Sequence, residues 1–406
     1  MSSSKGSDMP TKVLALLRDR GPLPMTHLGE YRGVSRSKLG QEVAELGRLG
    51  LVVRDGQAPS RGGRPSNIVS LSNDVRYAGI DIGATSIAVG ITDGYLDVLD
   101  FVEEEADVHE GPDAVLGRAV ELVRELAGRQ GVARLAGLGI GVPGPVSFRD
   151  GRLVGAPLQM PGWERYPIRD RLTRELSLPV TVDNDVNAMA LGEAHAGAAR
   201  GADDFLFVKL GTGAGCAIVT NGVLYRGADG CAGEISHNRT VNSQSLCSCG
   251  RTGCLNAEFG AAALTRQALV AAQSRESPIL ARMLEENGTL TPVDVGAASA
   301  AGDAYATQMI RRGGRLVGEV VANLINVFNP SRIVIGGGLL RLGPLLLAEI
   351  KSSALHSSTP LATTHLSIVQ TALDGRAGVI GAAWLASETL IDTLAGTTES
   401  GIPQSA

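Results

Sequence analysis

The sequence has no apolar run long enough to cross a bilayer and no apolar stretch near its first residue. A membrane-spanning helix needs about 18 consecutive apolar residues, and no segment of the 406-residue chain reaches that length. The opening MSSSKGSDMPTK lacks the apolar core of a signal peptide. These absences argue against a helical membrane protein and predict a cytoplasmic location.

Cysteine is scarce, with five in the chain. So few thiols in an expected reducing compartment argue against a disulfide framework. Cys216 and Cys231 stand apart among apolar or small residues, which indicates buried thiols without a special role. Cys247, Cys249 and Cys254 lie within eight residues of one another and need a separate explanation.

The chain is too long for one ordinary core, so two or three domains are expected. Its charge is unevenly divided. Residues 1–72 hold eleven Lys and Arg against six Asp and Glu, whereas the remainder holds 26 against 36. A basic N-terminal segment before an acidic remainder predicts that only the N-terminal segment meets a polyanion.

Three short helices are expected in the basic segment, in PTKVLALLRDRG, THLGEYRG and VSRSKLGQEVAELGRLGL. Gly33 forms the turn before the third helix, and Ser35 can cap it. Two strands, LVVRDG and NIVSLS, then flank the loop QAPSRGGRPS. Helix, helix, turn, helix and hairpin is the order of a winged helix-turn-helix, assigned to residues 10–72.

The third helix has an apolar and a polar face. The apolar face consists of Val34, Leu39, Val43 and Leu46. The opposite face offers side chains to a major groove, namely Arg36, Ser37, Lys38 and Gln41. Arg61 and Arg64 on the Gly-rich loop can enter a minor groove. A helical protein-binding or dimerisation module is the alternative, and the combination of helix spacing, divided charge and Arg-Gly loop favours DNA.

Glycine-rich turns recur in the acidic remainder. In YAGIDIGATSIAVGITDG, Asp81 can orient a magnesium ion, and the backbone from Gly83 to Thr85 can contact a phosphate. Two further candidate phosphate-binding segments contain Gly211, Thr212 and Gly213, and Gly336, Gly337 and Gly338. Each alone is more often a plain hairpin. Their repetition predicts two related lobes with a ligand between them.

A candidate general base lies between the first two turns, in LPVTVDNDVNAMALGEAHAG. A strand delivers Asn184 and Asp185 to its carboxyl end, and a helix begins at once. Asp185 can accept the proton of a hydroxyl that attacks a phosphoryl group. Capping of the helix by either residue is the simpler explanation, and both roles can hold.

The three clustered cysteines form C-x-C-x4-C, with His237 ten residues before the first. Three thiolates and one imidazole make a closed, structural zinc site. A disulfide is the alternative, but cysteines two residues apart bridge poorly. We therefore predict structural Zn²⁺ on His237, Cys247, Cys249 and Cys254.

Taken together, these motifs resemble the ROK family (repressors, open reading frames and kinases) from about residue 10 to about residue 390. The matching segments are VSRSKLGQEVAELGRLGLV, GGRP, DIGATSI, GIGVPGPV, VDNDVNAMALGE, GTGAG, GEISH, CSCGRTGCL and ANLINVFNPSRIVIGGGLL. The resemblance implies an α/β fold, a winged helix-turn-helix followed by a two-lobed, actin-like sugar-kinase body. The first lobe would span 76–184 with a C-terminal helix at about 374–394, the second 185–373, and 1–9 and 395–406 would be mobile tails.

The resemblance also implies roles for single residues. Asn184 and Asp185 would hold a sugar, and Asp185 would be the catalytic base of an ATP-dependent kinase. His237 would use one ring nitrogen on zinc and the other on the sugar. The implied sugar contacts are completed by Gly144, Glu234 and Asn256, and the turns at Asp81, Gly83 and Thr85, at 211–213 and at 336–338 would bind ATP and Mg²⁺ if activity is retained.

Several residues depart from the family pattern. Ala84 and Ser86 replace Gly and Lys in the first turn, and Cys216 and Ala217 replace two glycines in the second, where side chains would crowd a nucleotide. Ser236 replaces the glycine before His237. Asn256 stands where the family has a carboxylate, and Glu258 is a candidate substitute.

These departures favour a regulator over an enzyme. We predict a sugar-responsive transcriptional regulator, a repressor, with operator DNA and a sugar or sugar phosphate as partners, in a homodimer or homotetramer. An active glucokinase-like enzyme carrying a DNA-binding domain is the alternative. A metal-dependent interaction scaffold without a small ligand is a third possibility.

Overall fold

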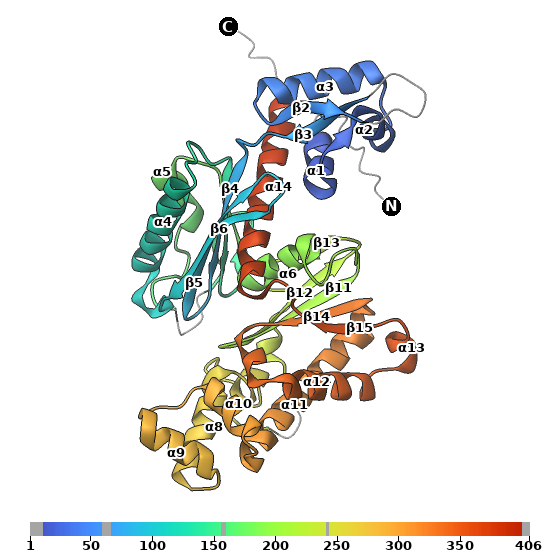
Figure 1. Cartoon of the computed structure of the whole chain (residues 1–406). Coiled ribbons are helices and arrows are strands. Elements are labelled where there is room, and N and C mark those ends of the chain that lie inside the picture. Colours follow the sequence, from blue (N-terminus) through green and yellow to red (C-terminus); the bar gives the residue numbers. More distant parts are fainter. Residues whose placement is uncertain (1–10, 59–65, 156–159, 241–242, 400–406) are drawn as a thin grey trace. The chain divides into compact units, whose positions relative to one another are not determined.

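The structure, a computed structural model, describes residues 11–58, 66–155, 160–240 and 243–399 (Figure 1). The chain divides into two compact units. The first contains Met1–Leu153, Gly162–His195 and Gly378–Ala406, and the second contains Val154–Pro161 and Ala196–Ala377. Arg61 and Arg64, the predicted minor-groove residues, lie outside the described residues.

The first unit begins with three helices and a small sheet, which we call the head (residues 11–72). The predicted helices and hairpin are present: α1 (Thr11–Arg20), α2 (Met25–Arg32), α3 (Arg36–Arg48), β2 (Val52–Gln57) and β3 (Asn67–Leu71). Gly33 has a left-handed backbone, and the Ser35 hydroxyl accepts from the Lys38 amide at 3.3 Å, so α3 begins where predicted. The sequence analysis missed β1 (Leu23–Pro24), which pairs with β3.

The rest of the first unit is a five-stranded sheet with the order β10-β7-β4-β5-β6. In Figure 1, α4 and α5 lie on one side of this sheet and α14 on the other. Its elements are β4 (Arg76–Ile82), β5 (Ser86–Asp93), β6 (Val98–Glu105), η1 (Val108–Glu110), α4 (Pro112–Arg129), β7 (Gly137–Val142), β8 (Val146–Ser147), β9 (Arg152–Leu153), α5 (Ile168–Leu176), β10 (Val180–Asn184), α6 (Asp185–Ala196) and α14 (Ala377–Glu399).

The second unit has its own five-stranded sheet, with the order β13-β12-β11-β14-β15. Its core joins this sheet to the helices α8, α10, α11 and α12. Its elements are β11 (Phe205–Leu210), β12 (Ala214–Thr220), β13 (Val223–Tyr225), η2 (Ile235–His237), α7 (Leu255–Glu258), α8 (Ala261–Gln273), α9 (Pro278–Asn287), α10 (Pro292–Ala300), α11 (Ala304–Phe328), β14 (Arg332–Gly336), η3 (Gly338–Leu342), α12 (Pro344–His356), α13 (Pro360–Thr363), β15 (Ser367–Gln370) and η4 (Asp374–Arg376).

The two sheets share one topology. In each, the first strand along the chain is central, the next two strands follow it as antiparallel neighbours, and the last two lie parallel on its other side. The predicted relationship between the two lobes is therefore visible in the strand order. Helix α14 extends to Glu399, five residues into the segment predicted as a tail. Within the described part of the chain, no helix is long and apolar enough to span a membrane.

Candidate functional site

In the first unit, Asp81 and Asp185 both lie close to one glycine, Gly141. Asp81 is next to the last residue of β4 and pairs in register with Gly141 of β7. A Cβ on Gly141 would lie 3.4 Å from the Asp81 carboxylate and 3.1 Å from the Asp185 Cα. The missing side chain therefore lets a strand end and the first turn of α6 approach closely, with both acids buried.

Asp81 also lies against helix α14. A Cβ on Gly378 would overlap the Asp81 carboxylate, so this acid lies against the first turn of α14. A negative charge near a helix N-terminus is favourable. Asp81 can thus stabilise α14 whether or not it orients a metal ion. Gly83 and Thr85 lie in the following turn, which is closed by a 2.8 Å hydrogen bond from the Gly83 amide to the Ser86 carbonyl.

Asn184 is largely occupied by contacts within the first unit. Its Oδ1 accepts from the amides of Val186 at 2.9 Å and Asn187 at 3.2 Å, and its Nδ2 donates to the Gly144 carbonyl at 2.9 Å. Asn184 therefore caps α6 and fixes the glycine that the resemblance places beside a sugar. The capping role foreseen for the Asn-Asp pair belongs to Asn184, which leaves the Asp185 carboxylate at the start of the helix.

The sequence analysis missed Asp183, the acid before this pair. Its Oδ1 accepts from the Asn184 amide at 2.7 Å and from Asn187 Nδ2 at 2.8 Å. The residue is 1% exposed. The segment V-D-N-D could have revealed it, because an acid inside a buried strand needs hydrogen-bond partners.

In the second unit, the predicted phosphate-binding segments also serve packing. The turn at Gly211, Thr212 and Gly213 is closed by a 2.8 Å hydrogen bond from the Gly211 amide to the Gly213 carbonyl. Gly337 has φ +96°, and a Cβ there would overlap the Leu210 carbonyl. Packing of β14 against β11 is thus a sufficient reason for Gly337, apart from any nucleotide.

Cys216 does not crowd a phosphate-binding turn. Its thiol lies in the core of the second unit, and burial raises the pKa of the thiol to about 12. The replacement of a family glycine at this position is therefore absorbed by the core, contrary to our expectation. Cys231 is exposed, so the prediction that it is buried was wrong.

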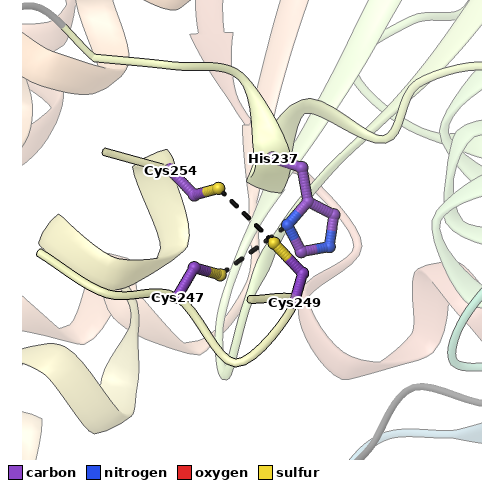
Figure 2. A group of neighbouring side chains, drawn as sticks. All are labelled: His237, Cys247, Cys249 and Cys254. Carbon is purple, nitrogen blue, oxygen red and sulfur yellow. Dashed lines mark hydrogen bonds between the residues drawn. The ribbon is translucent and has the colours of Figure 1, made fainter. Parts of the chain in front are cut away.

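The four predicted zinc ligands come together (Figure 2). Their ligand atoms all lie within 4.8 Å of one another. Cys254 precedes α7, His237 ends η2, and Cys247 and Cys249 lie on the intervening loop. Hydrogen bonds from the backbone and side chain of Arg251 lower the pKa of Cys249 to about 6, so the metal-binding thiolate is its main form at neutral pH.

The cluster has the dimensions of a tetrahedral metal site. Zinc–sulfur bonds of about 2.3 Å place neighbouring sulfur atoms about 3.8 Å apart in a tetrahedron. The Cys249 and Cys254 sulfur atoms are 3.7 Å apart, and Cys247 Sγ is 3.8 Å from His237 Nδ1. A disulfide would bring two sulfurs to about 2.05 Å, and all five cysteines are free. The donor set therefore fits zinc, with Nδ1 as the nitrogen facing the cluster.

Asn256 and Glu258 have different surroundings on α7. Asn256 Oδ1 is buried and has no hydrogen-bond partner within the described residues. It lies near the second glycine turn, since a Cβ on Gly213 would be 3.4 Å from it. The amide that replaces the family carboxylate thus keeps an acceptor beside that turn.

Glu258 contacts the cysteine loop and helix α11. Its carboxylate accepts from the Ser243 hydroxyl and from Arg312 at 2.7 Å, and its side chain is 4% exposed. Ser243 belongs to the loop that carries Cys247, and Arg312 belongs to α11. Glu258 therefore ties the cysteine loop to a core helix, and each of its carboxylate oxygens already has a partner there.

The predicted site residues fall into separate groups. The first unit holds Asp81, Gly83, Thr85, Gly144, Asn184 and Asp185, and the second unit holds Gly211, Thr212, Gly213, Glu234, His237, Asn256, Gly336, Gly337 and Gly338. In the head, Arg36, Ser37 and Gln41 are exposed on α3 and Lys38 is half-buried. The apolar face of α3 packs into the head core, with Leu39, Val43 and Leu46 buried.

This fold and these residues define a known class of proteins. The ROK family profile matches residues 77–389, and the chain belongs to the ROK family. It is 34% identical over 319 residues to a glucokinase of Halalkalibacterium halodurans, which covers 78% of this chain and 96% of the relative.

Two other relatives match more of the chain. A xylose repressor of Caldicellulosiruptor bescii is 30% identical over 376 residues, covering 91% of this chain and 92% of the repressor. A crystal structure of a ROK family transcriptional regulator, a homologue of the E. coli MLC protein, has a TM-score of 0.80 at 25% identity and covers 96% of this chain. Both matches cover more of the chain than residues 77–406, so both extend into the head region, whereas the family profile begins at residue 77.

Proposed function

We propose that the protein is a sugar-responsive transcriptional regulator, a repressor that binds operator DNA through the head and a sugar through its ROK body. The observation that carries this proposal is the extent of the likeness. A regulator structure covers 96% of the chain and a xylose repressor 91%, whereas a glucokinase covers 78%. The extra length corresponds to a segment with its own core and a net positive charge.

The order of the elements in the head and the exposure of α3 support a winged helix-turn-helix. Helix α3 follows α2 after a tight turn at Gly33, and its first half presents Arg36, Ser37 and Gln41 to solvent. A recognition helix reads base edges with residues near its N-terminus. We infer that α3 is that helix and that the β2–β3 hairpin is the wing. Reading two half-sites needs two heads, so we also propose a homodimer or homotetramer.

Zinc completes the body in this proposal. His237, Cys247, Cys249 and Cys254 would hold one Zn²⁺, which would supply a fixed charge and no open coordination position. His237 Nδ1 faces the cysteines, so Nε2 is the ring nitrogen left to contact a sugar hydroxyl. The metal would in this way orient a sugar-binding side chain.

A selection experiment tests the proposed function. The full-length protein is mixed with a random duplex library, the enriched duplex is recovered, and its affinity is measured with and without glucose or xylose. We expect nanomolar-range binding that changes about 5–150-fold with one of the sugars. Enrichment of no duplex, or an affinity that no sugar of a broad panel changes, would refute the proposal.

An active sugar kinase that carries a DNA-binding head is the second candidate. The buried pair Asp81 and Asp185 and the 34% identity to a glucokinase favour it. Cys216 no longer argues against it, because its thiol lies in the core. ADP release in the presence of a sugar distinguishes the two candidates.

A further inference from the structure

The head is fastened to the rest of the first unit by a buried arginine. The Arg18 side chain, at the end of α1, is 4% exposed and forms an ion pair with Glu388 of α14 at 2.5 Å. The same guanidinium donates to the Ser387 hydroxyl at 3.1 Å and lies 5.0 Å from the Trp384 ring centroid. The guanidinium also pairs with Asp19 of α1 at 2.8 Å, so its charge has one partner in the head and one on α14. Glu388, Ser387 and Trp384 are therefore the contacts that hold the buried guanidinium against α14.

Apolar contacts extend the same junction. Ile391 and Leu394 of α14 pack against the head core, to which Leu14 and Leu17 of α1 belong. Trp384, Glu388, Ile391 and Leu394 recur at helical spacing, so one face of α14 meets the head. The covalent link between head and body is therefore supplemented by a packed interface.

The other end of α14 lies at the candidate ligand residues. A Cβ on Gly378, in the first turn, would overlap the Asp81 carboxylate, and a Cβ on Gly381 would overlap the Ala188 carbonyl of α6. Helix α6 begins at Asp185. From Gly378 to Glu388 the helix rises about 15 Å, so one continuous element joins this site to Arg18.

Helix α14 fits its sheet too closely to move alone. A Cβ on Gly79 of β4 would overlap the Val379 carbonyl, and one on Gly139 of β7 would overlap the Ala382 carbonyl. Backbones in direct contact transmit a shift of one element to the next. Displacement of Asp81 or of the start of α6 therefore has to be shared with α14.

A second connection runs through α6. His195 Nε2, near the end of this helix, lies 3.1 Å from the Tyr95 carbonyl. The Tyr95 hydroxyl in turn accepts from the amide of Leu71, the last residue of β3 in the head, at 2.8 Å. Of the two helices that begin near the candidate ligand residues, α14 thus contacts the head directly and α6 reaches it through Tyr95.

We propose that α14 and α6 carry the state of the ligand site to the head, and that Arg18 and Glu388 are the positioning residues that make this coupling. The proposal rests on the proposed function. Neither residue touches DNA or sugar. Their role is to set the orientation in which the head is held, so that a shift at Asp81 or Asp185 changes the affinity for DNA.

The test compares Glu388→Gln with wild type, using the duplex enriched by the wild-type protein and the sugar that most raises the melting temperature among glucose, xylose and N-acetylglucosamine. Glu388→Gln keeps the side-chain shape and removes the charge. We expect the variant still to be stabilised by the sugar and still to bind the duplex. The ratio of its DNA affinities with and without sugar should be smaller than the wild-type ratio by at least about fivefold, or should approach one. Glu121→Gln, which removes an exposed partner of Arg118 in the same unit, should leave the change intact.

Each result bears on a definite claim. A Glu388→Gln protein with the full wild-type response overturns the coupling proposal alone. A wild-type protein that enriches no duplex, or that responds to no sugar, overturns the proposed function and the coupling with it. If Glu388→Gln unfolds the head, the sugar-induced change in DNA affinity is measured for Ser387→Ala instead, because this variant removes one hydrogen bond from the same guanidinium. A partial loss of response then supports the coupling, and an unchanged response overturns it.

Discussion

At the scale of single residues, the convergence of three cysteines and one histidine distinguishes a metal site from unrelated thiols. One histidine and three cysteines converge on one point. Of the two other cysteines, Cys216 is buried in the core and Cys231 is exposed. The chain thus contains its own control, since one cysteine can be changed inside the cluster and another outside it.

We expect the purified protein to carry about one zinc per chain and Cys249→Ser to lose it. Serine offers a poor ligand for zinc, and a cluster with three ligands releases metal to a chelator far more readily. Elemental analysis after dialysis against a chelator checks this, with Cys231→Ser as the matched control that keeps its zinc. Equal zinc contents in both variants, or none in freshly purified wild type, would rule out the assigned ligands.

Glu258 should make the stability of the body sensitive to acid. Burial raises the pKa of this carboxyl, but the hydrogen bond from Ser243 and the charge of Arg312 outweigh burial and leave the pKa below its usual value of 4.5. A lowered folded-state pKa means that the ionised group stabilises the fold above about pH 4.5, and this contribution disappears as the pH falls through the folded-state pKa.

Glu258→Gln should therefore lower the free energy of unfolding at pH 7 by about 1–3 kcal/mol. It should also flatten the loss of stability between about pH 5 and pH 3. Urea unfolding at a series of pH values measures both effects. Glu285→Gln, at an exposed ion pair, should change neither, and the same acid-dependent slope in Glu258→Gln and wild type would show that the carboxylate is not the titrating group.

At the scale of elements, most of the architecture could be predicted from local pattern. Apolar spacing located α1, α2 and α3, and Ser35 marked the start of α3 because a cap is a local interaction. Strand β1 escaped prediction because it is two residues long and contains a proline, and only its pairing with β3 defines it. Contacts between distant segments were equally invisible, as for Arg18 and Glu388, which are 370 residues apart.

The site shows the same division. The residues that converge on the zinc site could be predicted, because ligand type and spacing within one loop are local. The engagement of Asn184 with Gly144 and of Glu258 with Arg312 could not, since both partners lie far away in the sequence. The burial of Cys216 was predicted correctly. The expectation that its side chain crowds a phosphate-binding turn was wrong, because the sequence does not say which face of a strand meets the core.

Helix α3 should contribute phosphate contacts from its N-terminal half. Arg36→Ala should weaken binding to the enriched duplex and reduce the slope of log affinity against log salt by about one. Arg48→Ala, at an exposed position at the other end of the same helix, should change the slope less. A salt titration by fluorescence anisotropy measures both, and equal slopes in the two variants would exclude α3 as the DNA-reading element.

At the scale of the whole molecule, the chain joins a ROK body to a head, and the glucokinase relative is too short to contain a matching head. The glucokinase match covers 96% of that protein but 78% of this chain. Within the first unit, α14 and α6 join the acids of the body to the head, and we propose that this lets the state of the body change the affinity of the head for DNA. The central claim is therefore that the ROK body binds a sugar in order to signal and does not phosphorylate it.

The most direct test is ADP release by the purified protein with ATP and Mg²⁺ across hexoses, pentoses and N-acetylhexosamines. The sugars that raise the melting temperature are identified first, since a sugar at 100 times its Kd stabilises by about 2.7 kcal/mol. The account predicts that at least one sugar stabilises the protein and that ADP release stays at the level of Asp185→Asn. Sugar-dependent turnover that disappears in Asp185→Asn would contradict it and establish a working kinase.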